Sequence, residues 1–278
     1  MIETIITSPL FPFFVFVAGA CIGSFLNVCI YRIPIEVSIV HPGSHCAACG
    51  APIRWYHNLP IVSWIYLRGR AACCGTKIDF RYCIIELLTG LLFLALWNKY
   101  PSAIFLGYAV FVSGLIVSSC IDIDHFIIPD RFTLGGCVAG FILSALLPQM
   151  HHEATAWKGF TESVRGAFIG GIVLFLVAKI GSAVLKKEAM GLGDVKFLAA
   201  MGAFLGPLPT IFILACSSLF GSLFGITFVL QQQKSWGTRM PYGPFLALAA
   251  VLWLLGGQEW THDYLRSWDQ VTTPADIP

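Results

Sequence analysis

The chain has 278 residues, of which 57% are hydrophobic and 12% are charged, with a net charge of +2 at neutral pH. Soluble domains carry about 25% charged residues, so this composition excludes the soluble fold classes and indicates a polytopic membrane protein. The net charge excludes no class, because the placement of Lys and Arg in a membrane protein matters more than their sum.

Eight apolar segments are candidate transmembrane helices, since a span needs about 20 predominantly apolar residues. The sequence therefore predicts an all-α polytopic membrane fold with about eight transmembrane helices, the sixth of them short. The stretch before the first segment holds Glu3 and no Lys or Arg, which favours a span over a signal peptide. In chain order the segments cover residues 9–31, 83–97, 103–121, 132–147, 167–185, 195–205, 207–230 and 244–255.

The Lys and Arg residues between these segments predict the orientation, because cytoplasmic loops carry an excess of them. With the N-terminus outside, twelve fall on the inner side and four on the outer side, so we expect a periplasmic N-terminus. The inner set is Arg32, Arg54, Arg68, Arg70, Lys77, Arg81, Arg131, Lys186, Lys187, Lys196, Lys234 and Arg239, and the outer set is Lys99, Lys158, Arg165 and Arg266.

The long polar stretch between the first two spans predicts a small cytoplasmic domain. This gives four expected parts of the chain. They are a first transmembrane helix at 1–31, a cysteine-containing domain at 32–82, a seven-helix membrane domain at 83–257 and a polar tail at 258–278.

Four cysteines of this domain predict a zinc site. Cys46 and Cys49 form a C-x-x-C knuckle, and Cys73 and Cys74 follow after 23 residues. Two such pairs are typical of structural zinc, although the contiguity of the second pair makes tetrahedral ligation by both thiolates more awkward. His45 and Cys83 are reserve ligands. The cytoplasmic side argues against a stable disulfide.

Three aspartates, Asp122, Asp124 and Asp130, lie where the chain leaves one apolar segment and enters the next. An ionised Asp at mid-bilayer costs about 2.5–3.5 kcal/mol on insertion scales, so several at one helix end indicate a site. Asp122 extends the helix face that carries Ser118 and Ser119, whereas Asp124 points about 200° away from Asp122. The chain should turn by Ile128, before Pro129, and Asp130 is placed to cap the next helix.

A fourth aspartate, Asp194, follows Gly191 and Gly193 at the start of the short sixth segment. A helix N-terminus favours a carboxylate, and glycines allow close approach of a backbone. If Asp194 and Asp122 meet at the same depth, one can deprotonate a water and the other can protonate a leaving amine, which is aspartic-protease chemistry. The alternative is that these residues cap helices and lie at the interface.

Other polar and small residues within the apolar segments have either packing or functional interpretations. Residues 23–27 suit close helix packing or interhelical hydrogen bonds. Glu86 has three interpretations: a carboxylate buried in the protein, an ion-pair partner of Arg81, or a residue at the membrane–water interface. Gly166, with Gly170 and Gly171, indicates helix packing.

In this order the motifs resemble those of the bacterial type IV prepilin peptidases, the leader peptidase and N-methyltransferase family of pilus and type II secretion systems. The resemblance runs from the first span to about residue 255. It rests on Gly23 to Asn27, Arg32 with Pro34, Cys46 with Cys49, Asn58 to Pro60, Ser63-Trp64, Arg81-Tyr82, Glu86 to Gly90, Asp122 through Asp130, Gly191 to Lys196, and Gly243-Pro244.

The resemblance implies a polytopic aspartic peptidase of the bacterial inner membrane that cuts prepilins or pseudopilins after the Gly of a short basic leader, on the cytoplasmic face. The new N-terminal residue, usually Phe, is then methylated from S-adenosylmethionine. The family's catalytic aspartates fall on Asp122 and Asp194, and either fits the role of acid or base. The supporting residues are Gly191, Gly193, Lys196, Asp124, Asp130 and Glu86, and the leader would meet the acidic cluster of Asp124, Asp130 and Glu188.

Two positions depart from the family pattern, and two other functions compete with it. The first cysteine of the family's second knuckle falls on Ala71, with Cys73 as the candidate substitute, and the Pro that usually follows Arg-Tyr is Cys83.

A proton-coupled transporter would also use intramembrane carboxylates, but we find no convincing internal repeat. A membrane redox protein using its cytoplasmic thiols is the third candidate.

Overall fold

A computed structural model describes residues 8–186, 190–232, 240–261, 263 and 266. Among the residues discussed above, Glu3, Lys187, Glu188, Lys234, Arg239 and most of the polar tail lie outside these ranges. The chain forms two compact units, Met1–Gly136 and Cys137–Pro278, and the boundary falls within helix α6 (Asp130–Leu146). Over the described residues the secondary structure is helical apart from loops and two isolated bridges, which confirms the all-α expectation.

A helix overlaps each of the eight expected segments, and five helices are long and apolar enough to cross a membrane. The chain is therefore a multi-pass membrane protein. The five are α2 (Phe11–Arg32), α4 (Phe80–Lys99), α5 (Ile104–His125), α7 (Ala156–Leu185) and α9 (Pro207–Gln232). The shorter ones are α6, α8 (Leu192–Leu205) and α10 (Gly243–Leu252), which a π-helical turn, Trp253–Gly257, continues.

Helix α7 begins 11 residues before the expected apolar segment at 167. Thr155 caps the helix by accepting a hydrogen bond from the backbone N–H of Lys158. The added turns carry charged side chains, among them an ion pair between Arg165 and Glu162. Hydropathy finds the apolar part of a helix and misses such a polar extension.

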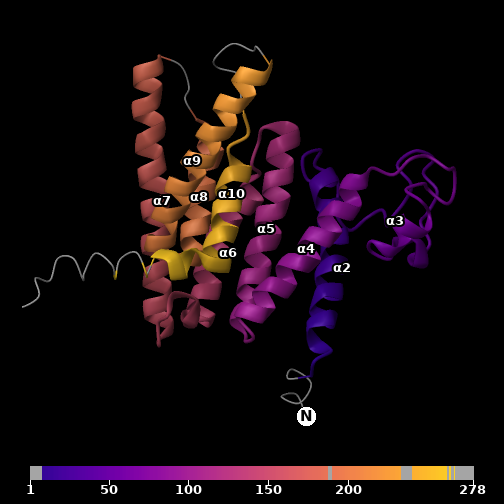
Figure 1. The fold of residues 1–278 in the computed structure, drawn as a ribbon, viewed down its shortest axis with the longest axis horizontal. Helices are drawn as coiled ribbons and strands as arrows, with labels where there is room; N and C mark the ends of the chain where they lie inside the picture. Colours follow the sequence, from indigo (N-terminus) through magenta and orange to yellow (C-terminus); the bar gives the residue numbers. More distant parts are fainter. Residues whose placement is uncertain (1–7, 187–189, 233–239, 262, 264–265, 267–278) are drawn as a thin grey trace, which may run out of the picture. The chain divides into compact units, whose positions relative to one another are not determined.

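In the first unit, α2 packs closely against α4 through glycines (Figure 1). A Cβ added at Gly19 would lie 2.9 Å from the Cα of Gly90, and one at Gly23 would lie 2.8 Å from the Cα of Glu86. Real Cβ atoms do not approach so closely, so these positions need glycine. The packing interpretation of the motif at residues 23–27 is therefore correct for Gly23.

The loop between α2 and α4 is anchored by the last residue of α2. The Arg32 side chain is buried, and its guanidinium donates to the carbonyls of Ser38 and Pro42 at 2.9 and 2.8 Å. Two short helices follow, a 3-10 helix at Trp55–Asn58 and α3 at Val62–Tyr66. The loop ends at Asp79, whose carboxylate caps α4 by accepting from the backbone N–H of Arg81 at 2.9 Å.

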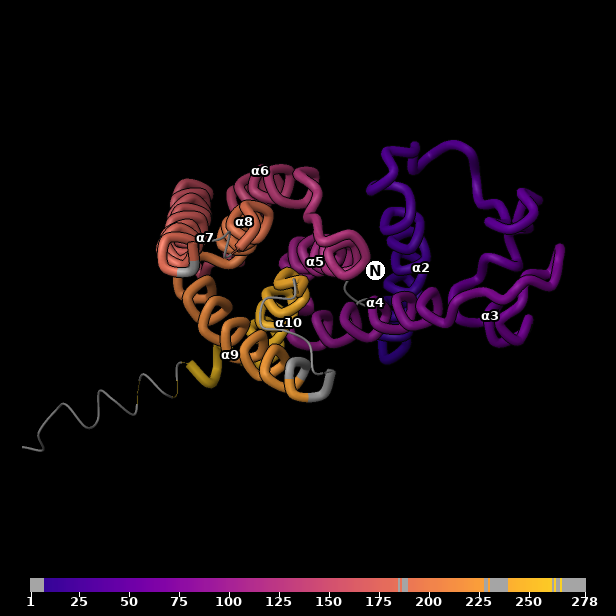
Figure 2. Tube along the Cα trace, turned by 90° about the horizontal axis from the view of Figure 1, so that it is seen from above, coloured from indigo at the N-terminus to yellow at the C-terminus, as the bar shows by residue number. Residues whose placement is uncertain are grey.

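In the second unit, α8 lies beside α7 in both views, and glycines again allow the contact (Figures 1 and 2). A Cβ at Gly166 would collide with the carbonyl of Gly202, and one at Gly170 would lie 2.7 Å from the carbonyl oxygen of Leu198. A Cβ at Gly171 would meet only Ala199, at an ordinary 3.6 Å. The expected packing role is confirmed for Gly166 and Gly170, whereas Gly171 leaves room for a methyl group.

One polar cluster ties the ends of these helices together. The hydroxyls of Ser144 and Ser163 both donate to the carbonyl of Ala203, and Ser144 also contacts the imidazole of His151 at 2.7 Å. Burial lowers the pKa of His151 to about 4, so the ring is neutral at physiological pH. The cluster joins α6, α7 and α8 and has a structural role.

We predict opposite effects for the same substitution at two positions of α7. Gly166→Ala should lower the thermal stability of the purified protein, because overpacking a tight contact costs about 1–3 kcal/mol. Gly171→Ala should leave stability unchanged or raise it by up to about 1 kcal/mol, since alanine favours a helix over glycine. Thermal unfolding in one detergent compares the two. Equal destabilisation by both variants would contradict the assigned contact.

Candidate functional site

Asp122 lies in the last part of α5 on a buried polar face. Its side chain is 5% exposed, and Ser118, one turn earlier, is fully buried. The hydroxyls of Ser118 and Ser119 have no hydrogen-bond partner among the described residues, whereas Ser113 donates to the carbonyl of Ala109 at 2.7 Å. Buried polar groups without a partner are rare and mark places where a water or substrate group binds. The expected face of Ser118, Ser119 and Asp122 is therefore present.

Asp124 occupies the same helix end but has a different environment. Its side chain is 33% exposed and accepts from Nη1 of Arg81 at 2.8 and 2.6 Å. The Nη2 of Arg81 also donates to the carbonyl of Cys120 at 3.2 Å. Arg81 thus holds the end of α5 against the start of α4. The pairing of Arg81 with Glu86, one of the three interpretations for Glu86, is wrong.

The connection from α5 to α6 follows the expected course. Phe126, at φ 56°, ends α5 in the left-handed conformation and donates its N–H to the carbonyl of Asp122 at 2.9 Å. The helix is over before Pro129, as the proline predicts. Asp130 is the first residue of α6, where its Oδ1 accepts from the hydroxyl of Thr133 at 3.2 Å.

Asp194 lies in the first turn of α8, after the N-cap residue Gly191 in the sequence. The macrodipole of a helix favours a carboxylate at this end. Gly191 has an ordinary φ of −73°, and a Cβ there would approach Asp194 Oδ2 no closer than 3.7 Å. Neither local strain nor local crowding requires this glycine, so its role in approaching a substrate stays a prediction, as does that of Gly193. Lys196 follows on the same helix and is half-buried.

The two candidate catalytic aspartates belong to different units. Asp122 lies in the first and Asp194 in the second. Each has the local setting that the sequence predicts, a polar helix face for Asp122 and a helix N-terminus for Asp194. Their pairing stays a prediction.

The sulfurs of Cys46, Cys49, Cys73 and Cys74 all lie within 4.8 Å of one another. The Sγ–Sγ distances are 3.7 Å between Cys46 and Cys74, 3.4 Å between Cys49 and Cys73, and 3.8 Å between Cys73 and Cys74. Tetrahedral zinc with Zn–S bonds of about 2.3 Å places its sulfurs about 3.8 Å apart. The four thiols therefore have the spacing of a metal-binding cluster and could hold a metal ion.

Two turns of the same design bring these cysteines together. In the first, the N–H of Gly50 donates to the carbonyl of Cys46 at 2.8 Å, and the N–H of Cys46 donates to the carbonyl of Ala51. In the second, Gly75 and Ala71 make the same two hydrogen bonds, with the carbonyls of Ala71 and Thr76. Ala71 thus occupies the position of Cys46, and Cys74 that of Cys49.

The second turn has no thiol at Ala71, the position equivalent to Cys46, and Cys73 of the same turn supplies one instead. Cys73 stands where the first turn has Ala48, and its sulfur still reaches the sulfur of Cys49. The contiguous pair therefore contributes both thiols, as the sequence allowed. His45 turns to the carbonyl of Gly43 at 2.9 Å.

Contacts within the cluster change the acidity of three of its thiols, Cys46, Cys73 and Cys74. The Thr76 hydroxyl, 3.2 Å away, lowers the pKa of Cys74 to about 6. Backbone N–H groups of Cys49 and then Ala48 lower the pKa of Cys46. Contacts with Cys49 and then Cys46 favour the neutral thiol of Cys73 and raise its pKa to about 12. Thiolates are the metal-binding form, so two of the four positions are prepared for a cation.

Glu86 is buried where α2 crosses α4. Its side chain is 8% exposed, and its Oε2 accepts from the N–H of Ile61 at 2.7 Å. Ile61 has a φ of 63°, which is strained for a β-branched residue and occurs mainly where the surroundings fix the backbone. The carboxylate thus pins the loop onto α4. The sequence marked Glu86 but gave no signal for Ile61.

Comparison with known families divides the chain into two matched regions. Residues 17–100 match the family described as Bacterial Peptidase A24 N-terminal domain, and residues 109–226 match the Type IV leader peptidase family. The cysteine cluster and Glu86 fall in the first region, and Asp122 and Asp194 in the second.

Curated relatives match over most of this chain. A prepilin leader peptidase/N-methyltransferase of Myxococcus xanthus is 40% identical over 82% of this chain and 66% of the relative. One of Dichelobacter nodosus is 32% identical over 93% of this chain and 96% of its own length. A type 4 prepilin-like proteins leader peptide-processing enzyme of Escherichia coli is 34% identical over 86% and 92%. No solved structure matches the chain.

Proposed function

Because this chain belongs to the type IV prepilin leader peptidase/N-methyltransferase family, an aspartic peptidase family, we propose that it processes prepilins or pseudopilins. It cuts off the short basic leader at the cytoplasmic face and methylates the new N-terminal residue. The observation that carries the proposal is the placement of Asp122. It is a buried carboxylate at the end of a membrane helix, on a face with two serine hydroxyls that lack partners among the described residues.

The proposed chemistry uses Asp122 and Asp194 as one acid–base pair. One carboxylate takes a proton from a water, which attacks the scissile carbonyl, and the other carboxylic acid protonates the leaving amine. Two carboxyl groups held close together share a proton, which provides both forms at once. The helix N-terminus at Asp194 stabilises the ionised form at that position.

The remaining site residues support this pair. Asp124 positions the end of α5 through its ion pair with Arg81. Because its charge is already paired, Asp124 contributes less to binding the basic leader than an unpaired carboxylate would. Asp130 begins α6, and Lys196 lies two residues beyond Asp194 on α8. We assign Gly191 and Gly193 to the close approach of the substrate backbone, which a glycine permits because it has no Cβ.

The proposed topology keeps eight spans. Helices α6, α8 and α10 are shorter than the five long helices and are apolar, and from α5 onward they alternate with them along the chain. With the N-terminus in the periplasm, twelve Lys and Arg residues face the cytoplasm and four face outward. The protein then lies in the bacterial inner membrane with both aspartate-containing ends on the cytoplasmic side.

We propose that the cysteine cluster binds one structural zinc ion. The ligands are Cys46, Cys49, Cys73 and Cys74, and the spacing of their sulfurs supports the assignment. Zinc bound by four thiolates has no open coordination position, so it holds the two turns together and takes no part in hydrolysis. The domain scheme follows: a membrane helix, the zinc domain at 32–82, the seven-helix peptidase domain at 83–257, and a tail.

The peptidase mechanism predicts that two neighbouring aspartates respond differently to the same change. Asp122→Asn keeps the shape but cannot exchange the proton, so it should remove essentially all cleavage, since acid–base groups contribute about 10²–10⁴-fold. Asp124→Asn should cost about tenfold or less, because it weakens a half-exposed contact with Arg81. The assay is the initial rate of leader removal at equal membrane abundance. An active Asp122→Asn enzyme would contradict the proposed mechanism. If, in that case, Asp124→Asn were inactive, Asp124 and not Asp122 would be the catalytic residue.

The zinc assignment predicts about one zinc ion per chain in protein purified without chelator. The double variant Cys46→Ser/Cys49→Ser should lose the metal and become less stable. As a matched control, Cys21→Ser/Cys137→Ser replaces two cysteines outside the cluster and should keep full metal content. Elemental analysis with thermal unfolding measures both. A metal-free wild-type protein with full activity would remove the proposal.

A further inference from the structure

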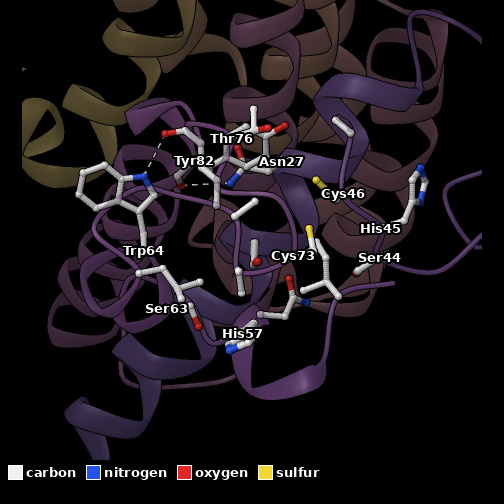
Figure 3. Close-up of a pocket in the computed structure, with 18 of the residues that line it drawn as sticks. Asn27, Ser44, His45, Cys46, His57, Ser63, Trp64, Cys73, Thr76 and Tyr82 are labelled. Carbon is white, nitrogen blue, oxygen red and sulfur yellow. Dashed lines mark hydrogen bonds between the residues drawn. The ribbon is translucent and has the colours of Figure 1, made fainter. Parts of the chain in front are cut away.

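A cavity of about 820 Å³ lies in the first unit, and the peptidase mechanism does not use it. It is enclosed by the C-terminal half of α2, the start of α4 and the loop between them (Figure 3). All of its lining residues fall between Ser24 and Glu86, within the region matched by the N-terminal family. Binding sites for small molecules have volumes of about 300–1,000 Å³, so the cavity has the size of a ligand site.

The lining combines aromatic rings with charges of both signs. Trp64, Tyr82 and His57 line the cavity and can stack on a planar heterocycle (Figure 3). Glu86 contributes a buried carboxylate at the α2–α4 crossing. Arg54 contributes an exposed positive charge from the loop. A matching ligand carries a planar base, a cationic group and a carboxylate.

We propose that this cavity binds S-adenosylmethionine, the methyl donor, with Glu86 facing its sulfonium end. The assignment rests on the proposed methyl-transfer function. The donor has each of the three features, because its adenine is planar, its sulfonium is cationic and its amino-acid end carries a carboxylate. A buried carboxylate attracts a cation strongly, and aromatic faces add to this attraction. Arg54 and Lys77 then meet the donor's carboxylate at the exposed rim.

Two observations show that the cavity is a built site. The Ile61 N–H donates to Glu86 Oε2 at 2.7 Å, and Ile61 has a φ of 63°, which a β-branched residue adopts mainly where its surroundings fix the backbone. Asn27 donates to the carbonyl of Tyr82 at 3.1 Å and joins α2 to the start of α4 beside the cavity. The Glu86 carboxylate that would meet the donor's cation is thus held in place before the donor binds.

The cysteine cluster shares a wall with this cavity, since Cys46 and Cys73 also line it. A metal that joins the two turns would therefore fix part of the donor site without taking part in the reaction. This gives the cluster a role in methylation that is separate from proteolysis.

The transfer itself needs no further reactant. The free amine of the substrate attacks the methyl carbon with its lone pair, and the carbon–sulfur bond breaks with its electrons going to sulfur. S-adenosylhomocysteine leaves, and the proton that the substrate ammonium lost before attack passes to solvent. The carboxylate of Glu86 binds the cation and is unchanged at the end.

The test is equilibrium dialysis of labelled S-adenosylmethionine with the full-length protein in detergent. We expect wild-type protein to bind one donor per chain. Ala72 is exposed and lines the cavity, so Ala72→Trp places a bulky indole ring in it. Ala72→Trp and Glu86→Gln should each weaken binding by about tenfold or more. Ala154→Trp, at an exposed alanine of the second unit, is the matched control and should bind as the wild type.

Separate readouts distinguish failure of this inference from failure of the proposed function. Methyl transfer to a peptide with a free N-terminal Phe measures the function, and donor binding by the variants measures the site. Wild-type affinity in both Ala72→Trp and Glu86→Gln, with methyl transfer intact, would place the donor elsewhere and overturn the inference. A wild-type protein that cleaves prepilin but transfers no methyl group would overturn the methylation part of the proposed function instead.

Discussion

The close contact between α2 and α4 determines the geometry of the first unit. Because Gly23 lacks a Cβ, the backbone of α2 reaches the Cα of Glu86, and the Glu86 carboxylate is buried under the loop. Helix α4, which carries Glu86, also carries Arg81, and the ion pair of Arg81 with Asp124 holds the end of α5. Helix α4 therefore contributes both to the cavity and to the contact that holds the helix end carrying Asp122. A larger residue at Gly23 would separate the two helices and disturb both.

Much of this arrangement follows from the sequence, for physical reasons. Long apolar segments must become helices in a membrane, because their backbone groups have no other hydrogen-bond partners there. The spacing of Ser118 and Asp122 puts both on one face of any helix, and Pro129 ends the helix before it. The cysteines could be assigned to a cluster because two closely spaced pairs in one polar loop are typical of structural zinc.

Other features depend on contacts between distant segments, which local patterns do not encode. The pairing of Arg81 with Asp124 joins residues 43 positions apart, so Glu86 was an equally reasonable partner. The sequence named Cys73 as the candidate substitute for the thiol missing at Ala71, but whether its sulfur reaches the cluster depends on the shape of a turn, which spacing does not give. The cavity is formed by the ends of two helices and by loop segments with no shared periodicity, so only the folded chain reveals it.

We propose that proteolysis and methyl transfer use different parts of one chain. The measurement that tests this is methyl transfer by an Asp194→Asn enzyme to a synthetic peptide that already carries a free N-terminal Phe. We expect that cleavage of prepilin is lost while this peptide is still methylated at close to the wild-type rate, because Asp194 lies outside the unit that contains the cavity. Loss of methyl transfer in a correctly folded Asp194→Asn protein would contradict it and show that the two activities share a site.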